Sequence, residues 1–463
     1  ALMFDGLTRA FNGVKNWFFP TSTARQDFGV ETSVTQGMRE NIELWWAMYV
    51  NRPPWANRDV VPLGLPAAIA RELARPALVE FSGTISGSAR AGYLDECFQD
   101  AVPGFEHALE LGLALGGVAL RPYLYRDKLR VDASSILAFQ PTAYDEAGKC
   151  VGGVFRERVK SAGKYYLRLE AHSFEDGVYV IRNKAHESNQ NSTAGREVPL
   201  DTVPEWADIE PETRIEGLVR PLFAVFTPPL ANNIETDSKV GVSVYSGAVA
   251  GLIKECDIQW ERIWWEYKSG ERKIFAERTA GTAREFTSNR LYQLFATASG
   301  DMFREFSPEY RDEPLYRGLQ MTLKLIEFQV GLAYGTLSDP QSVEKSATEV
   351  LGSKQRQYIT ESHIQRSFAD ALDDLVYAMD AYTTLYGLAP PGDYDLSLNF
   401  GDGVLEDPES RRAERATDLS DVMQGLMSAV EYRVKWYLED EDTARANLAK
   451  MDELADEGQD EVE

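Results

Sequence analysis

The sequence predicts an α+β protein in which helices and strands occupy separate stretches of the chain. Three observations support this fold class. Apolar residues recur at helical spacing from about residue 30 to 115, and the period changes to two from about 118 to 226, which is typical of strands. Long amphipathic helical patterns then return from Val242 onward. The length of 463 residues allows about two to four domains or subdomains.

Local signals define the first two blocks. The helical block contains GMRENIELWWAMYVNRPPW, which is predicted to break at Pro53–Pro54 because proline cannot continue a helix, and DECFQDAVPGFEHALELGLALGG. The strand block is expected to be antiparallel, since its runs are short and separated by turn residues. Within it, residues 185–199 are polar and predict a surface loop.

The next elements are two helices with a small module between them. Apolar residues at steps of three and four from Val242 to Tyr267 predict one amphipathic helix, about 40 Å long, that ends at Ser269–Gly270. Residues 271–311 contain the strand-like pieces KIFAE, LYQLFAT and MFREF. A second helix is expected at about 313–333.

The remaining chain is predicted to be mainly helical. A very long helical pattern runs from Ser342 to Tyr386, and a bend is expected near Gly352, because a straight helix of this length would exceed about 60 Å. Residues 391–463 predict one strand, then helices, then the acidic tail DEGQDEVE.

The sequence contains no predicted transmembrane segment. Its longest apolar run, Leu111 to Leu120, is too short for a hydrocarbon core that needs about 20 apolar residues. The N-terminal segment ALMFDGLTRAFNGVKNWFF has Leu7, Phe11, Val14 and Phe18 at helical spacing, but charged residues interrupt any signal-peptide core. Two alternatives remain for this segment, an amphipathic helix that docks on protein and an amphipathic helix that binds a membrane surface.

The charge balance limits how the protein can meet nucleic acid. Lys and Arg total 48 against 73 Asp and Glu, which gives a formal net charge of −25. Tight, static binding to DNA draws its affinity from cations that displace phosphate counterions, so this balance argues against it. An acidic surface along which DNA slides without sticking is compatible with the same charge.

No catalytic constellation or metal site is predicted, so we expect neither enzyme activity nor a cofactor. The four histidines have no second histidine at ligand spacing, and Cys97, Cys150 and Cys256 form no CxxC pair and are expected to be reduced. The glycines from 112 to 117 lack the Lys and Ser/Thr of a phosphate loop, and small-residue helix packing explains them better. In Gly83–Gly87 the serine stands one position too late for a nucleophile elbow.

Two pairs of adjacent tryptophans, Trp45–Trp46 and Trp264–Trp265, fall in helical segments. Adjacent side chains on a helix point in different directions, so each pair can bury two surfaces at once. This favours a helix bundle or a subunit interface. Stacking on nucleic-acid bases would use the same residue types, but the pairs lack interleaved cations.

One segment resembles the portal proteins of tailed bacteriophages, particularly those with long non-contractile tails. The resemblance rests on VGLAYGT at the end of a helix, on the box EKSATEV that opens a long helix, and on Tyr358 and His363 behind it. The matching residues are Val330, Gly331, Leu332, Gly335 and Thr336, then Lys345, Ser346, Ala347, Thr348, Glu349 and Val350. Specific motifs cover roughly residues 220–450, and the first 100 residues match only in general pattern.

The resemblance implies a ring, typically of twelve subunits, with wing, stem, clip and crown regions around an axial channel. The chain would divide into an N-terminal segment and wing (1–237), a first stem helix (238–270), a clip (271–311), a second stem helix (312–335), a channel loop (336–345), a long kinked helix (346–390), and a C-terminal strand with crown helices and acidic tail (391–463). Such a ring carries out no bond chemistry, because a separate terminase motor hydrolyses ATP.

The resemblance also implies which residues would meet DNA and partner proteins. The channel-loop candidates are Thr336, Leu337, Ser338, Asp339, Gln341, Ser342 and Lys345. The candidate stem contacts to phosphate are Lys239, Lys254, Arg262 and Lys268, and the clip candidates for terminase or connector binding are Arg272, Lys273, Arg278 and Arg304. Lys345 is the only cation of the loop, and it can equally cap the helix or pair with a carboxylate.

The implied partners are further copies of the chain, double-stranded DNA, terminase, a head-to-tail connector, and the major capsid protein with its scaffold, without a membrane. The implied location is the capsid vertex of the virion, after assembly in the host cytoplasm. The alternative is another oligomeric minor capsid or head-assembly protein, which would share the helices and the acidity but need no DNA channel.

Overall fold

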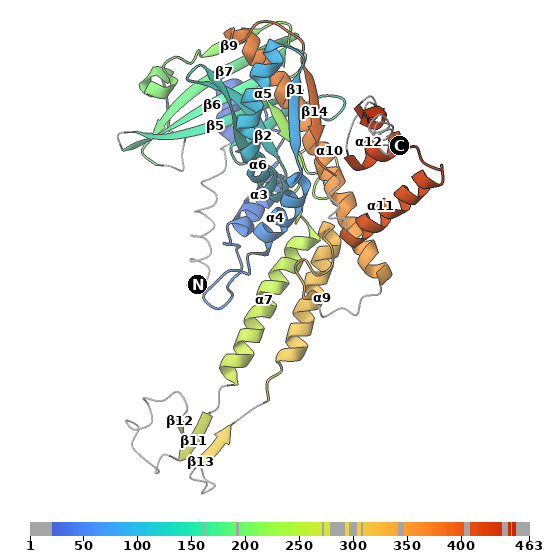
Figure 1. Ribbon diagram of the computed structural model, residues 1–463. Coiled ribbons are helices and arrows are strands. Elements are labelled where there is room, and N and C mark those ends of the chain that lie inside the picture. Colours follow the sequence, from blue (N-terminus) through green and yellow to red (C-terminus); the bar gives the residue numbers. More distant parts are fainter. Residues whose placement is uncertain are drawn as a thin grey trace, which may run out of the picture. The chain divides into compact units, whose positions relative to one another are not determined.

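The chain forms two compact units, Ala1–Gly403 and Val404–Glu463. The computed structural model describes residues 21–161, 163–190, 194–270, 273–277, 292–295, 303–306, 309–340, 347–401, 408–437, 443–445 and 447–450. The N-terminal amphipathic pattern at residues 7–18 therefore lies outside the described residues. Helices and strands are both abundant, as the α+β prediction requires (Figure 1).

The helices of the first unit are α2 (Thr21–Phe28), α3 (Gln36–Tyr49), α4 (Leu65–Leu78), α5 (Ala89–Ala101), α6 (Phe105–Leu115), α7 (Ala248–Ser269), α9 (Asp312–Val330) and α10 (Ala347–Tyr386). Its strands are β1 (Ser82–Ser86), β2 (Val118–Tyr125), β3 (Lys128–Ser135), β4 (Phe139–Tyr144), β5 (Cys150–Ser161), β6 (Lys164–Glu175), β7 (Val178–Ser188), β8 (Arg196–Val198), β9 (Glu212–Ile215), β10 (Ala224–Phe226), β11 (Lys273–Glu277), β12 (Tyr292–Phe295), β13 (Phe303–Phe306) and β14 (Asp395–Asn399).

The strand-rich block forms two sheets, and every pairing in them is antiparallel, as predicted. One sheet has the order β10-β2-β3, and the other has the order β4-β5-β6-β7-β8 with β9 also on β7. The surface loop predicted at residues 185–199 is wrong at both ends, because β7 continues to Ser188 and β8 begins at Arg196. His186 is buried there, and its Nε2 lies 2.8 Å from Oδ2 of Asp27 on α2.

The main core lies where α3, α4, α5, α6 and α10 pack together. The apolar run of α6 is buried along most of its length. The small-residue packing predicted for its glycines is confirmed, because a Cβ on Gly112 would lie 2.6 Å from the ring of Phe226. Phe105 of α6 makes an edge contact with Phe368 of α10 at a centroid distance of 5.7 Å. Such ring pairs add about 0.5–1.5 kcal/mol beyond the burial of their area.

A strand interrupts the helical block where only helices were expected. Residues Ser82–Ser86 form β1, which pairs antiparallel with β14 from the far end of the unit. The outer edge of β1 is covered by α5, since Asp95 accepts a hydrogen bond from the backbone N–H of Ile85 at 2.9 Å and Gln99 donates to the carbonyl of Gly83 at 2.7 Å. The strand of the C-terminal block thus belongs to the first unit.

The helix predicted from Val242 begins six residues later, at Ala248. The first part of the pattern is apolar because it is buried core, and the N–H of Val244 donates to the carbonyl of Leu113 at 3.0 Å. Gly247 has φ 58° and ψ −123°, which is not helical. The predicted end at Ser269–Gly270 is confirmed.

The long helix α10 runs without interruption from Ala347 to Tyr386 and includes Gly352. A bend at Gly352 stays a prediction. Between α7 and α9 the strands β11, β12 and β13 match the predicted pieces KIFAE, LYQLFAT and MFREF, and they pair in the order β12-β11-β13.

A buried ionic network joins the two sheets at Glu170. Its carboxylate lies 2.8 Å from Arg121, 2.6 Å from Arg168 and 2.7 Å from Nε2 of His172. Burial opposes ionisation of Glu170, but the two guanidinium groups outweigh it and hold its pKa well below the usual range. Burial lowers the pKa of His172, whose Nδ1 lies 2.8 Å from the hydroxyl of Tyr179.

Gln140 on β4 is fully buried, and neither atom of its amide has a hydrogen-bond partner among the residues that the structure describes. An unsatisfied buried amide destabilises the fold, and an apolar side chain of similar shape removes that cost. We therefore expect Gln140→Met to raise the free energy of unfolding by about 1 kcal/mol in urea titration. Gln99→Met is the contrasting variant and should lower the free energy of unfolding, because Gln99 donates a hydrogen bond to the carbonyl of Gly83. A stability loss in Gln140→Met would contradict the prediction.

The second unit contains the predicted C-terminal helices, α11 (Pro408–Met423) and α12 (Ala429–Tyr437). A capping box begins α12, since Ser428 and Glu431 each accept a hydrogen bond from the other's backbone N–H, at 3.1 and 2.8 Å. Asp418 of α11 accepts hydrogen bonds from Lys435 and Trp436 of α12, at 2.6 and 2.8 Å.

Candidate functional site: a helix pair and the loop that follows it

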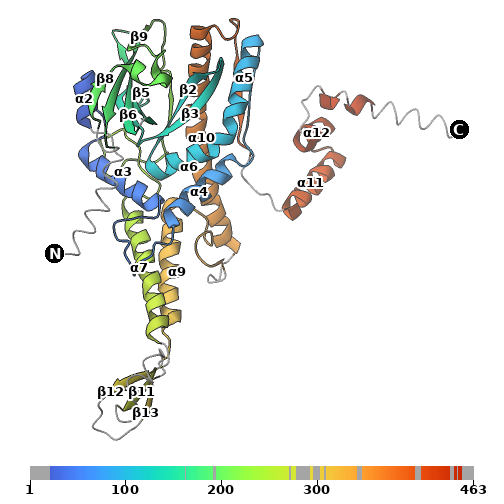
Figure 2. The same ribbon diagram turned by 90° about the vertical axis from the view of Figure 1, so that its left-hand side faces the viewer.

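The helices α7 and α9 lie side by side and extend away from the core of the first unit (Figures 1 and 2). Each helix directs one apolar stripe at its neighbours in the unit. The buried stripe of α7 includes Ile253, Cys256 and Ile263, and that of α9 includes Leu319 and Leu323. These residues recur at steps of three, four and seven, and Cys256 and Ile263 belong to the pattern that predicted α7.

Polar contacts fix the register of the pair near the strands β11–β13. Glu266 of α7 accepts hydrogen bonds from the backbone N–H of Arg311, from its Nε at 3.1 Å and from its Nη2 at 2.9 Å. The bonds from Arg311 hold the pKa of Glu266 below its usual range. Beside them Tyr267 donates to Asp312 at 3.0 Å.

A second stripe of α9 is apolar but exposed. Met321, Leu325 and Phe328 stand at i, i+4 and i+7, so they share one face of the helix, and they are 64%, 51% and 56% exposed. The guanidinium of Arg356 on α10 lies 4.8 Å from the ring centroid of Phe328, and the rest of the stripe faces outward. Exposed apolar stripes of this kind are uncommon on monomeric proteins.

The outer part of α7 carries exposed aromatic residues. Trp264 and Trp265 are 50% and 62% exposed, whereas Trp45 is fully buried. Trp264 makes edge contacts with Trp260 and Tyr267 at centroid distances of 6.0 and 6.4 Å. Trp264 and Trp265 are therefore not buried within the protomer. Of the two predictions for this pair, a helix bundle and a subunit interface, the subunit interface stays a prediction.

Three of the four cations predicted to contact phosphate lie on α7, and the fourth does not. Lys254, Arg262 and Lys268 are exposed on α7, and no ion pair to Lys254 or Lys268 occurs among the described side chains. Lys239 is not on the stem helix, because α7 begins only at Ala248; it lies beside Gly148 in the β4–β5 turn. Lys239 therefore lies outside the helix on which it was expected, and its contact with phosphate stays a prediction.

The loop after α9 folds back onto the helix around the carboxylate of Glu327. Oε1 of Glu327 accepts hydrogen bonds from the backbone N–H groups of Gly335, Leu337 and Ser338 at 3.1, 2.6 and 2.8 Å. Oε2 accepts from the Ser338 hydroxyl at 2.9 Å. Glu327 is fully buried, and hydrogen bonds to a charged group contribute about 1.5–3 kcal/mol each.

The described part of the predicted channel loop is only partly exposed. Thr336 is exposed and Asp339 is half-buried, but Leu337 packs against the core and Ser338 is 3% exposed. The hydroxyl and the N–H of Ser338 both bind Glu327, so its side chain is not at the surface, and its contact with DNA stays a prediction. Gln341, Ser342 and Lys345 lie outside the described residues.

Of the clip candidates, the structure places two on strands. Lys273 is the first residue of β11, and Arg304 lies in β13 opposite Phe275 of β11. Arg272 and Arg278 lie outside the described residues.

Sequence reasoning missed Glu327 and Gln320, the two α9 side chains that hold the loop. Gln320 accepts a hydrogen bond from the N–H of Asp339 at 2.7 Å. A signal for both was present, because they stand seven residues apart and fall on the buried side of α9 beside Leu323 and Val330. A polar residue at an apolar position of a helix indicates a buried hydrogen-bond partner.

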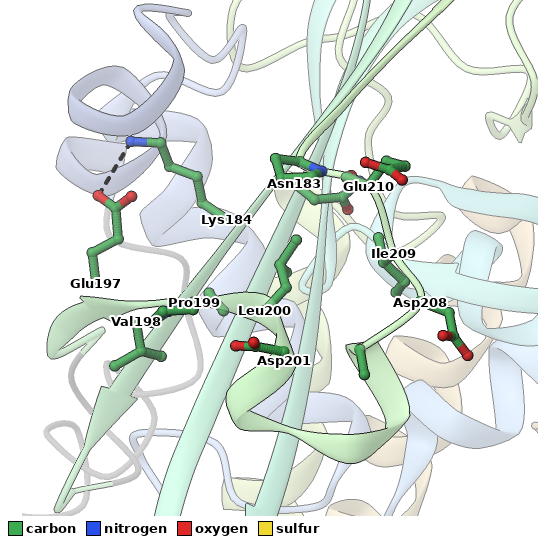
Figure 3. Close-up of a pocket in the computed structure, with 13 residues that line it drawn as sticks. Asn183, Lys184, Glu197, Val198, Pro199, Leu200, Asp201, Asp208, Ile209 and Glu210 are labelled. Atoms are coloured by element: carbon green, nitrogen blue, oxygen red, sulfur yellow. Dashed lines mark hydrogen bonds and ion pairs between the residues drawn. The ribbon is translucent and has the colours of Figure 1, made fainter.

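A surface hollow of about 570 Å³ lies on the large sheet, between β7 and the segment that joins β8 to β9 (Figure 3). Its exposed rim carries the carboxylates of Glu197, Asp201, Asp208 and Glu210. Lys184 is the cation of the lining and is paired with Glu197 at 3.3 Å, so the hollow has no free cation for an anionic ligand (Figure 3).

No family model and no curated protein sequence matches the chain. In the part of the chain that the structure describes, no group of three or more His, Cys, Asp or Glu is placed to hold a metal ion. No helix within the described ranges is both long and apolar enough to cross a membrane.

Proposed function

We propose that this chain is the subunit of a phage portal, a ring at the capsid vertex through which double-stranded DNA is packaged and ejected. The observation that carries the proposal is the helix pair α7 and α9, which projects from the core with apolar side chains exposed on both helices. In this proposal the pair is the stem, the sheets with α10 are the wing, and β11–β13 belong to the clip.

The two exposed surfaces differ, so they can join in a head-to-tail contact, and such a contact closes into a ring if the rotation permits. The stripe of Met321, Leu325 and Phe328 on one protomer would pack against the Trp264–Trp265 region of the next. Adjacent stems would then line the channel.

Charge supports passage of DNA over tight binding. With a net charge of −25 the protein repels the phosphate backbone overall, so DNA inside a ring would stay hydrated and mobile. Lys254, Arg262 and Lys268 are exposed cations on α7 that can contact phosphates transiently. At physiological salt such contacts act over about 8 Å, so each cation would reach only the nearest phosphates.

The proposed partners follow from the two ends of the stem. The clip region would dock terminase during packaging and a head-to-tail connector afterwards, and short strands such as β11–β13 can extend by pairing with a strand of another chain. The wing would contact the major capsid protein and its scaffold. Chemistry would remain with terminase, and the portal would supply the docking ring and the conduit.

Electron microscopy of the purified protein tests the proposal. We expect end-on views of a ring of about twelve subunits with an open axial channel, since twelve is typical of the family that the sequence resembles, although purified rings can differ from the virion in subunit number. A monodisperse monomer or compact dimer at micromolar concentration would refute the conduit and favour another capsid or head-assembly protein.

A further inference from the structure

The loop after α9 is held from two sides. On the α9 side Glu327 and Gln320 together accept hydrogen bonds from four backbone N–H groups between Gly335 and Asp339. Tyr316, one turn before Gln320, also donates to the Asp339 carboxylate at 3.4 Å.

On the other side, α10 closes over the start of the loop. Gln357 accepts a hydrogen bond from the N–H of Ala333 at 3.2 Å, and the guanidinium of Arg356 lies 5.0 Å from the ring centroid of Tyr334. Gly331 has φ +81°, and a Cβ there would lie 2.2 Å from Oγ1 of Thr360. Only glycine allows this close approach of the loop to α10.

These contacts make the loop difficult to release. Glu327 is fully buried, so withdrawal of the loop would leave a charged carboxylate without its hydrogen-bond donors in the interior. The donated N–H groups would lose their partner at the same time. The segment from Gly335 to Asp339 therefore behaves as part of α9.

We infer that Glu327 is a positioning residue, which fixes the segment Gly335–Asp339 to the helix pair. The inference deepens the proposed function and rests on it for the role of the loop beside DNA. Leu337 and Ser338 then belong to the part of the loop that is attached to α9. Of the four candidate channel-loop residues that the structure describes, Thr336 to Asp339, only Thr336 has an exposed side chain.

Hydrogen–deuterium exchange on the intact protein tests the inference. In the wild type the amides of Gly335, Leu337 and Ser338 should exchange slowly, and Glu327→Ala should accelerate them at least tenfold. Glu327→Gln should give an intermediate rate, because the amide oxygen can still accept from the three N–H groups. Ser338→Ala, which removes only the hydroxyl contact, should stay within a few-fold of wild type.

Amides of the sheet β5–β6 serve as the internal control, since a positioning role leaves their exchange unchanged. Equal acceleration there and in the loop would mean general unfolding and would overturn the inference, as would unchanged loop exchange in Glu327→Ala. The exchange measurement does not depend on the oligomeric state. If the protein forms no rings but the loop amides exchange slowly, the proposed function is refuted and the role of Glu327 stands.

Discussion

Leu325→Glu should abolish ring assembly while leaving the protomer folded. Leu325 is at the centre of the exposed stripe of α9 and is 51% exposed, so a charge there meets water in the free protomer. In the proposed contact it would be buried without a partner, and burial of an unpaired charge costs several kcal/mol. The cost recurs at every interface of the ring. Sedimentation velocity and circular dichroism would check the two halves of the prediction.

Two control variants distinguish the loss of a subunit contact from the effect of an added charge. Leu325→Met keeps an apolar side chain of similar volume and should assemble as the wild type does. Val219→Glu places the same charge at an apolar position that is 81% exposed and lies outside the helix pair, and it should also assemble. Rings formed by Leu325→Glu would mean that α9 does not supply the subunit contact.

Glu170→Ala should lower the free energy of unfolding by about 3–5 kcal/mol, which is the usual effect of removing one partner from a buried ionic network. The substitution would leave the guanidinium groups of Arg121 and Arg168 in the interior, where their side chains are 12% and 9% exposed. Urea titration would measure the loss. Glu187→Ala is the control, because Glu187 pairs with Lys164 and Arg196, whose side chains are 43% and 75% exposed, and it should cost about 1 kcal/mol or less.

The same network predicts how stability depends on pH. Because the pKa of Glu170 is held below its unfolded value, its contribution is complete above about pH 4.3 and is lost as the pH falls through the lower folded value. The lowered pKa of His172 acts in the same direction, from about pH 6.5 downward. Glu170 also raises the pKa of His172, so the comparison is made in a His172→Phe background. There Glu170→Ala should lose less stability than its parent between pH 5 and the acid limit of folding, and an equal loss would contradict this account.

Sequence patterns predicted the features that depend on local periodicity. The α+β class, the antiparallel block and the end of α7 at Ser269 follow from apolar spacing and from glycine, and all three are observed. The predicted start of α7 was too early, because Val242 and Tyr245 are buried in the core of the unit without being part of the helix. Periodicity cannot distinguish these two causes.

Features that depend on distant partners were not predictable. SGTISG has too few apolar residues to indicate a strand, and β1 exists because β14 and α5 satisfy its backbone groups. The burial of Ser338 likewise depends on Glu327, eleven residues earlier on a different element. The sequence suggested a loop at this position, but its attachment to α9 required the structure.

The pairing of β1 with β14 also determines the order in which the first unit can form. The link is reinforced by Ser88, which donates to the carbonyl of Asp393 across 305 residues of sequence, and by Arg90, which donates to that of Pro390 across 300. Contacts of such long range form late and slow folding. On the ribosome the edge of β1 that pairs with β14 would remain without its partner until α10 and β14 had been synthesised, because α5 covers only the opposite edge.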